Sequence, residues 1–309
     1  MKRVQSKLLA LLLAMVLAFS LAVPAFAAPV DGVEMEGKIV ILHTNDVHGA
    51  IENYAKVAAL KAQYEEAGAV VLLMDAGDFI QGTTNVSDSE GATAVELMNL
   101  VGYDVAAPGN HEFDYGYFNL TNLAKAADFP ILAANIKYEG KTPFDAHIVL
   151  EAGEKKIGVF GLSTPETATK AHPAKIKGVT FVGGEDLYAL AQGEVKSLQG
   201  EGCDYIICLG HLGIDDETAA TKNRSIDLLE QVNGIDVFID GHSHSTLEEV
   251  KEATGGAGKV GDTYLTSTGT KLANVGRIIL DGETITIDSV STEGIEAPED
   301  SEVAKRAAA

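Results

Sequence analysis

Five short polar motifs, each at the end of an apolar run, contain the residues that could perform chemistry. In chain order they are Asn45-Asp46-Val47-His48, Gly77-Asp78, Gly109-Asn110-His111-Glu112-Phe113-Asp114, Gly210-His211 and Gly241-His242-Ser243-His244. Taken alone, a Gly-His or Gly-Asp pair after a strand is typical of a turn. The motif around His111 is more specific, because its combination of Asn, His, Glu and Asp has little use in a turn.

The candidate metal ligands in these motifs offer oxygen and nitrogen donors without a thiolate: Asp46, His48, Asp78, Asn110, His211, His242 and His244. Such a mixed set suits Mn²⁺, Zn²⁺, Fe or Co²⁺ better than Ca²⁺, which prefers oxygen ligands alone. This is more than one catalytic ion needs. It suits two ions that share a bridging carboxylate and lie about 3.5–4 Å apart. The sequence therefore predicts two divalent transition-metal ions (Mn, Zn or Co), with no residues assigned to any other cofactor.

Phosphate chemistry is consistent with the charge of the chain, which is −22 over 309 residues. An acidic protein that handles phosphate needs another source of positive charge, and a pair of metal ions supplies it while activating water as a nucleophile. No serine or cysteine stands out as a covalent nucleophile. The acidity also disfavours a nucleic-acid polymer or an anionic membrane as partner, because no Lys/Arg cluster is present to neutralise phosphates.

The elements that must position these motifs alternate along the chain. Strands are predicted at 38–42, 70–74, 104–107, 131–135, 156–162, 205–209 and 237–239, and helices at 54–67, 93–101, 120–127, 185–199 and 225–232. Three late strands are predicted at 264–267, 273–280 and 284–290, the last two joined at Asp281-Gly282. This alternation predicts an α/β domain with largely parallel strands. Ligands bind outside the carboxyl ends of such strands, so the motifs are expected to converge.

The two ends of the chain read differently from its middle. Residues 1–27 have basic Lys2, Arg3 and Lys7, an apolar stretch and Ala25-Phe26-Ala27, which together predict a signal peptide cleaved after Ala27. We therefore expect an exported protein without stable membrane insertion, with a linker at 28–37 and a catalytic domain at 38–291. Residues 292–309 are interpreted as an acidic linker toward an absent C-terminal domain. This linker is expected to start a helix that then stops without a cap or partner.

Over roughly residues 37–290 the constellation resembles the calcineurin-like metallophosphoesterase superfamily, and the Asn110–Asp114 motif resembles its 5′-nucleotidase branch. The resemblance implies a four-layer αββα sandwich, two sheets packed face to face with helices outside. It also implies these ligand sets: Asp46, His48 and His244 on one ion, Asn110, His211 and His242 on the other, and Asp78 bridging both. His111 would then be the catalytic histidine, oriented by Asp114.

The resemblance implies metal-dependent hydrolysis of phosphate monoesters, most directly nucleoside 5′-monophosphates, with the base held by a C-terminal substrate-binding domain. Two residues point to different branches of the family. His244 is more similar to cyclic-nucleotide phosphodiesterases, whereas Asp114 is more similar to 5′-nucleotidases. A 2′,3′-cyclic-nucleotide phosphodiesterase or a nucleotide-sugar hydrolase therefore stays an alternative. A non-catalytic surface binding module is the alternative from another class, and loss of a ligand or of His111 would have favoured it.

Overall fold

The computed structural model describes residues 35–215 and 221–309. The predicted signal peptide at 1–27 and most of the predicted linker at 28–37 lie outside the described residues. In the described stretches, no helix has the length and apolar character needed to cross a membrane.

The first sheet has five strands in the order β13-β12-β1-β2-β3. Strands β1 (Ile39–Thr44), β2 (Val70–Asp75) and β3 (Val105–Ala106) are parallel. Strand β12 (Asn274–Asp281) pairs antiparallel with β1 and with β13 (Thr284–Ser291). The hairpin predicted at Asp281-Gly282 is therefore confirmed, and it adds an antiparallel edge to a parallel sheet.

The second sheet has six strands in the order β10-β11-β9-β8-β6-β5. Their bounds are β5 (His147–Ala152), β6 (Lys155–Ser163), β8 (Tyr205–His211), β9 (Val237–Ile239), β10 (Lys259–Val260) and β11 (Thr263–Thr266). The central strands β6, β8, β9 and β11 are parallel, whereas β5 and β10 close the two edges in antiparallel pairs. Both sheets thus present the carboxyl ends of parallel strands.

The two sheets pack face to face over one hydrophobic cluster. It contains Ile41 and Met74 from the first sheet together with Val159, Ile207 and Ile239 from the second. Every residue of β1 and β8 is buried, as expected for parallel strands covered on both faces. The predicted α/β sandwich of two stacked sheets is confirmed.

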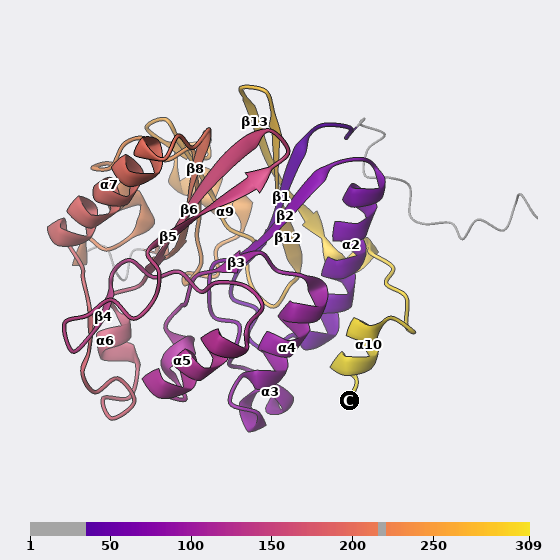
Figure 1. Ribbon diagram of the computed structural model, residues 1–309, viewed down its shortest axis with the longest axis horizontal. Helices are drawn as coiled ribbons and strands as arrows, with labels where there is room; N and C mark the ends of the chain where they lie inside the picture. Colours follow the sequence, from indigo (N-terminus) through magenta and orange to yellow (C-terminus); the bar gives the residue numbers. More distant parts are fainter. Residues whose placement is uncertain (1–34, 216–220) are drawn as a thin grey trace, which may run out of the picture. The chain divides into compact units, whose positions relative to one another are not determined.

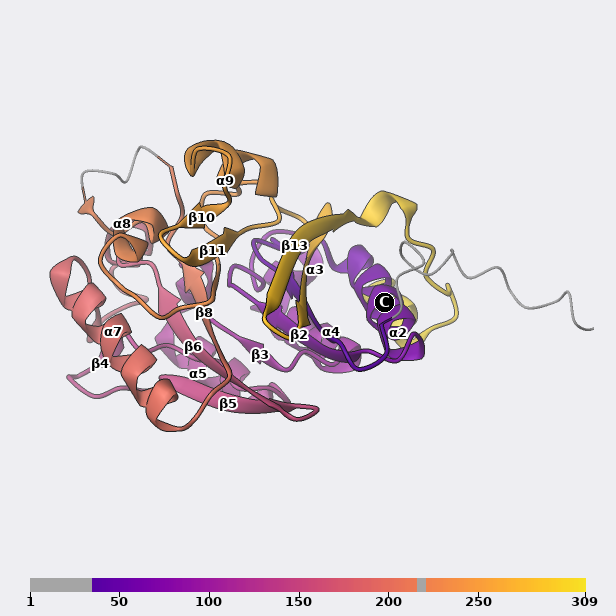
Figure 2. The same cartoon turned by 90° about the horizontal axis from the view of Figure 1, so that it is seen from above.

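Helices cover the outer faces of the sheets (Figures 1 and 2). Beside the first sheet lie α2 (Tyr54–Glu66), α4 (Ala92–Val101) and α10 (Glu302–Ala307), and beside the second lie α7 (Glu185–Gly200), α8 (Ser225–Leu229) and α9 (Leu247–Ala253). Leu187, Val195 and Leu198 of α7 pack with Phe160 and Ile206 of the second sheet in a separate apolar cluster. The shorter elements are η2 (Ile51–Asn53), α3 (Thr84–Asp88), η3 (His111–Phe113), α5 (Tyr117–Ala126), β4 (Ile136–Tyr138), α6 (Thr167–Lys170), β7 (Val179–Phe181) and η5 (Thr292–Gly294). Strands β4 and β7 form a separate antiparallel pair.

The strand predicted at 131–135 was wrong. Ile131 makes a single parallel bridge to Ala106, after which Leu132 bridges to Asp145. The backbone N–H of Ala134 then donates to the carbonyl of Gly161. The segment thus bonds to the first sheet at Ile131 and Leu132 and to the second sheet at Ala134. It therefore forms no continuous ladder with either sheet.

The prediction that the C-terminal helix lacks a partner was also wrong. The side chain of Ser301 caps α10 by accepting from the N–H of Ala304. Val303 is buried, and α10 contacts α2 and α4. Arg306 lies 2.8 Å from the carboxylate of Glu96 on α4. These contacts could not be read from the tail itself, because their partners lie some 200 residues earlier.

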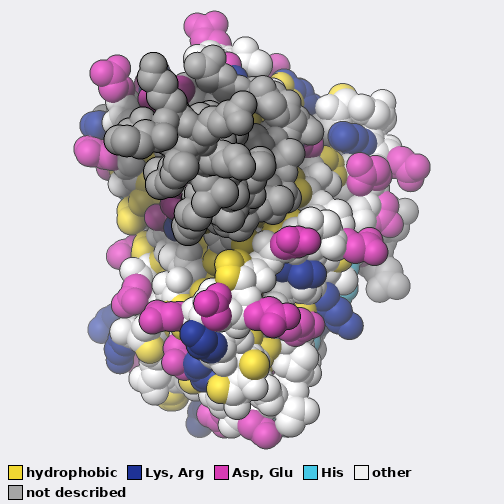
Figure 3. Space-filling view, turned by 90° about the vertical axis from the view of Figure 1, so that its right-hand side faces the viewer, with side chains coloured by type: hydrophobic (Ala, Val, Ile, Leu, Met, Phe, Trp, Pro, Cys, Tyr) yellow, Lys and Arg dark blue, Asp and Glu magenta, His cyan; other side chains and the backbone are white. Residues whose placement is uncertain are grey.

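Acidic and basic side chains are interspersed over the described part of the face that Figure 3 shows. A separate ionic cluster joins β5 of the second sheet to α7, the helix that packs on that sheet. His147 Nδ1 lies 2.5 Å from Glu194 Oε2, and its Nε2 lies 3.0 Å from Glu201 Oε1. Burial lowers the pKa of His147, but hydrogen bonds to both carboxylates outweigh this and raise it.

A raised folded-state pKa means that His147 stabilises the fold fully below its unfolded pKa of about 6.5. This contribution is lost as pH rises through the folded-state pKa. We expect His147→Gln to lower the free energy of unfolding by at most about 1 kcal/mol at pH 6, since the cluster is partly exposed, and by less at pH 9.5. Urea denaturation at both pH values measures this. The double variant with Glu194→Gln should show the two effects to be coupled, and additive effects would contradict the pairing.

Candidate active site

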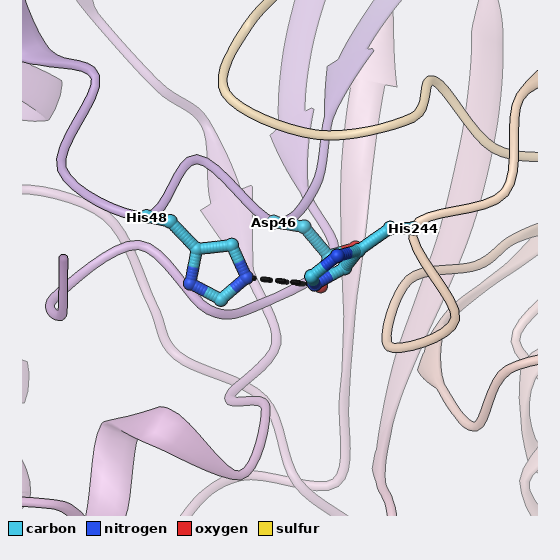
Figure 4. Close-up of side chains that lie close together, drawn as sticks. All are labelled: Asp46, His48 and His244. Atoms are coloured by element: carbon cyan, nitrogen blue, oxygen red, sulfur yellow. Dashed lines mark hydrogen bonds and ion pairs between the residues drawn. The ribbon is translucent and has the colours of Figure 1, made fainter.

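The polar motifs extend from the carboxyl ends of β1, β2, β3, β8 and β9, and the fold brings them together. The first group consists of Asp46, His48 and His244, whose ligand atoms lie within 4.8 Å of one another (Figure 4). Asp46 Oδ1 is 3.7 Å from His48 Nε2 and 3.4 Å from His244 Nε2. The two imidazole Nε2 atoms are 2.9 Å apart. Strands from both sheets therefore contribute to this group.

The second group consists of Asp78, His211 and His242, again within 4.8 Å of one another. His211 Nε2 lies 3.1 Å from Asp78 Oδ2. Asp78 Oδ2 also lies 3.9 Å from His48 Nε2, so this carboxylate stands between the two groups. Asn110 is buried at the same strand ends, and the backbone N–H of the following His111 donates to Asp78 Oδ1 at 2.8 Å.

The backbone of the candidate ligands is strained. Asp46, His48, Asp78, His242 and His244 all have φ between 45° and 78°, a region that L-residues rarely adopt and that Asp and His tolerate better than most. Such conformations persist only where the surroundings over-determine them, and they cluster at functional sites.

Two glycines allow the motifs to approach so closely. A Cβ at Gly109 would lie 2.2 Å from Asp78 Oδ1, and one at Gly241 would lie 2.7 Å from His211 Nδ1. A side chain at either position would push a candidate ligand away. The glycines in these motifs are therefore required by the convergence of the loops as well as by turn formation.

Three histidines of the two groups are each held through one ring nitrogen. His211 Nδ1 donates to the carbonyl of Ala76 at 2.6 Å, and His48 Nδ1 is 3.2 Å from Gln81 Oε1. His242 Nε2 is 3.0 Å from the carboxylate of Glu166. A proton on the held nitrogen leaves the lone pair of the other nitrogen free, which is the arrangement typical of metal-binding histidines.

Glu166 was not among the residues predicted from the sequence. It follows β6, and its Oε2 also lies 3.2 Å from Lys170 Nζ on α6. Its side chain is only 11% exposed. The available signal was its position just beyond a central strand, where the other functional motifs also begin.

Glu112 links the loop that contains Asp78 to the motif that contains His111. Its carboxylate is fully buried and accepts backbone N–H groups from Gly109, Asp78, Phe79 and Ile80 at 2.6–3.2 Å. Its place inside the His111 motif was the sequence signal for a role in positioning the site.

Asp240 performs the same task on the second sheet, since its Oδ1 accepts from the N–H groups of Leu212, Gly213 and Gly241 at 3.0–3.1 Å. On the first sheet, Asn45 Nδ2 donates to Asp46 Oδ2 at 2.7 Å. These buried polar side chains hold the loops in register, so the site is organised before any ligand arrives.

His111 and Asp114 form a pair beside both groups. His111 Nδ1 lies 2.6 Å from Asp114 Oδ2, and the rings of His111 and His48 are 5.3 Å apart. Burial lowers the pKa of His111, but the hydrogen bond to Asp114 and the charge of Asp78 raise it to about 8. The imidazolium form is thereby favoured, with Nε2 left free of Asp114.

The charges of the site favour a bound cation. Burial lowers the pKa of His211, yet the carboxylates of Asp78 and Asp46 raise it to about 10. Burial raises the pKa of Asp46 to about 7, although His211 opposes the shift. Two carboxylates confined in a desolvated space therefore favour the positively charged form of the His211 imidazole. The same carboxylates favour a bound cation.

The donor chemistry also fits metal ions. Within residues 35–215 and 221–309, the buried atoms without a hydrogen bond include Asn110 Oδ1 and His211 Nε2, the latter 3.1 Å from the Asp78 carboxylate. A buried polar atom without a partner is costly and calls for an explanation such as an ion. Both atoms belong to the candidate ligand set, and neutral imidazole, amide and carboxylate donors suit a transition metal. The residues present therefore fit divalent metal ions.

Comparisons with known proteins agree with this geometry. The family profile described as calcineurin-like phosphoesterase matches residues 39–246. A bovine 5′-nucleotidase is 34% identical over 235 residues, which cover 68% of this chain and 38% of that protein. A trifunctional nucleotide phosphoesterase of Bacillus subtilis, YfkN, is 28% identical over 249 residues, which cover 69% of this chain and 16% of that protein.

The fold itself is shared with a solved structure, the calcineurin-like phosphoesterase YfkN from Bacillus subtilis. That chain has a TM-score of 0.73 and 23% sequence identity, with 87% of this chain and 95% of that chain covered. The chain described here spans well under half the length of the bovine relative. Because the family profile matches more than half of the chain and spans all five motifs, this protein belongs to the calcineurin-like phosphoesterase family.

Proposed function

We propose that this protein hydrolyses phosphate monoesters, most directly nucleoside 5′-monophosphates, with the assistance of two divalent transition-metal ions (Mn, Zn or Co). The observation that carries the proposal is the convergence of two Asp/His groups around Asp78, with the His111–Asp114 pair beside them. Similarity to the bovine 5′-nucleotidase supports the choice of substrate.

In this proposal the chain holds its ions with ligands from both sheets: Asp46, His48 and His244 for one, Asn110, His211 and His242 for the other, and Asp78 for both. When bound, two such ions would polarise a phosphate and lower the pKa of a bound water. Glu166, Ala76 and Gln81 each hold one ring nitrogen of His242, His211 and His48, which would leave the other nitrogen available to an ion. Asp114 holds His111 Nδ1, so that the opposite nitrogen donates a proton or hydrogen bond to the departing oxygen.

A substrate panel tests this function. The full chain, supplied with Mn²⁺, is assayed with AMP, UMP, 2′,3′-cyclic AMP, UDP-glucose and an aryl phosphate. We expect AMP and UMP to release phosphate with similar kcat/KM values, because monoester chemistry resides in the metal site and the described residues of that site include no Phe, Tyr or Trp to grip a base. Turnover restricted to UDP-glucose would contradict monoester specificity, and binding without any turnover would favour a non-catalytic module.

A specific observation keeps one alternative open. His244, rather than an amide side chain, completes the first group with Asp46 and His48, and the similar Bacillus subtilis protein is a trifunctional nucleotide phosphoesterase. The second candidate function is therefore hydrolysis of a 2′,3′-cyclic nucleotide at the same site. Faster turnover of 2′,3′-cyclic AMP than of AMP would favour it.

The organisation of the whole protein belongs to the same proposal. We infer that residues 1–27 direct export, that residues 38–291 form the catalytic domain, and that 292–309 lead toward a C-terminal substrate-binding domain. The share of the bovine relative that lies outside the match supports a further domain.

A further inference from the structure

A cleft of about 700 Å³ opens directly beside the first Asp/His group. His48 and His244 are among its lining residues, so the cleft is continuous with the candidate metal site. The rest of its wall includes Glu52, Asn53, Gln81, Thr83 and Lys271. We name these five residues the cleft wall. The mechanism proposed above gives the cleft no role beyond the contact between Gln81 and His48.

Two loops of the cleft wall are fixed to each other. Thr83 Oγ1 donates to the carbonyl of Gly49 at 2.8 Å, and Gln81 Oε1 lies 3.2 Å from His48 Nδ1. A Cβ at Gly82 would lie only 1.8 Å from the carbonyl oxygen of His48. The backbones of the loops after β1 and β2 are therefore in direct contact. This contact holds Gln81 and Thr83 of the cleft wall beside His48.

The opposite side of the cleft is tied to Asp46. The backbone N–H of Lys271 donates to the carbonyl of Asp46 at 2.8 Å, and the carbonyl of Lys271 accepts from Asn53 Nδ2 at 3.4 Å. Lys271 has a φ of 59°, a left-handed conformation that is uncommon for lysine. The cleft is thus built around the same backbone groups that position the candidate metal ligands.

The chemistry of the cleft wall suits hydroxyl groups. Glu52 offers an acceptor, Lys271 offers donors, and Asn53, Gln81 and Thr83 carry groups that donate and accept. Glu52 and Lys271 carry opposite charges, so the wall has no excess positive charge for a second phosphate. Among the described residues that line the cleft, none is Phe, Tyr or Trp on which a base could stack.

We propose that this cleft is a binding subsite for the sugar or polyol part of a phosphate monoester whose phosphate occupies the candidate metal site. The inference rests on the proposed function and deepens it, because it assigns substrate selection to the catalytic domain itself. Vicinal hydroxyls each donate and accept, and therefore match a wall that offers both donors and acceptors. The chemical class selected is phosphate esters of polyhydroxylated alcohols, including the ribose of a nucleotide.

Matched substrate pairs test the subsite on the full chain with Mn²⁺. Ribose 5-phosphate is compared with n-pentyl phosphate, and glycerol 3-phosphate with n-propyl phosphate. Both members of each pair release a primary alcohol, so differences report recognition of hydroxyls. We expect kcat/KM to favour the polyol ester by roughly tenfold, the scale of a few net hydrogen bonds. A ratio near one with both esters hydrolysed overturns the subsite and leaves the proposed function intact. If neither member of a pair is hydrolysed and AMP is also left intact, both the subsite and the proposed function are overturned.

Variants of the cleft wall locate the preference. We expect Glu52→Gln and Lys271→Met each to reduce the polyol-to-alkyl ratio severalfold, and the double variant to bring it close to one. The matched controls Glu65→Gln on α2 and Lys196→Met on α7 are exposed and lie outside the cleft wall, and they should keep the ratio. Metal content, measured for every variant, separates loss of recognition from loss of ions. A double variant that keeps its ions and the full preference overturns the assignment of these residues.

Discussion

Treatment of the protein with a chelator is expected to abolish hydrolysis of an aryl phosphate, and Mn²⁺, Co²⁺ or Zn²⁺ should restore it. The reason is the donor set around Asp78, in which carboxylates and imidazoles converge at 4.8 Å or less within each group. Without ions, these groups offer no Lewis acid and no means of lowering the pKa of water. Phosphate release before and after chelation measures the effect, and elemental analysis should find about two ions per chain.

Graded variants connect the loss of activity to particular ligands. Asp78→Ala removes the carboxylate between the two groups, so it should abolish both ion retention and turnover. Glu166→Gln should weaken metal binding by about 10–100-fold, the usual effect of altering a partner that orients a metal-bound histidine. Titration of apo-protein with Mn²⁺, followed by its thermal unfolding, reports affinity without relying on activity. Glu185→Gln, an exposed change on α7, is the matched control. Full activity in metal-free protein would contradict the two-metal proposal.

His111→Ala is expected to lower kcat by roughly 10²–10⁴-fold, the scale for a positioned acid–base group, while the protein keeps its fold and its ions. The structural basis is the 2.6 Å contact to Asp114, which orients the ring, and the 5.3 Å separation from the ring of His48. Because His111 is outside the ligand set, its loss should separate metal retention from turnover.

The measurement combines steady-state kinetics with metal analysis of the same preparation. His172→Ala changes an exposed histidine outside the motifs and should leave kcat and metal content at their normal values. Asp114→Asn keeps the size of the partner but removes its charge, so it should reduce kcat in the same direction as His111→Ala. Near-normal kcat in His111→Ala, or loss of the ions along with the activity, would show that the assigned role is wrong.

The positions of the strands and helices around the site were largely predictable from local patterns. The predicted helix at 185–199 is observed as Glu185–Gly200, and the predicted strand at 237–239 is observed as Val237–Ile239. Both segments have the periodicity or β-branched content that their element requires, and each is bounded by a turn signal. The polar motifs follow these strands directly, so their convergence at the carboxyl ends could be expected from the parallel topology alone.

The segment at 131–135 shows where such reasoning stops. It is apolar and buried like a strand, but its hydrogen bonds are divided between Ala106 of the first sheet and Gly161 of the second. The C-terminal helix is a similar case, because α10, with its buried Val303, packs against α2, α4 and η2, which are distant in sequence. Local composition carries no information about a partner that is distant in sequence.

The sequence by itself determined the family, the alternation of elements and the candidate ligands, because residue type and spacing encode donor chemistry and local structure. Tertiary structure alone decided which carboxylates support those ligands and where a substrate can lie. Glu166 approaches His242 across 76 residues, and Glu52 and Lys271 meet at one cleft from opposite ends of the described chain. Such contacts arise from the packing of two sheets whose strand ends meet. They depend on the folded path of the backbone, which no local pattern records.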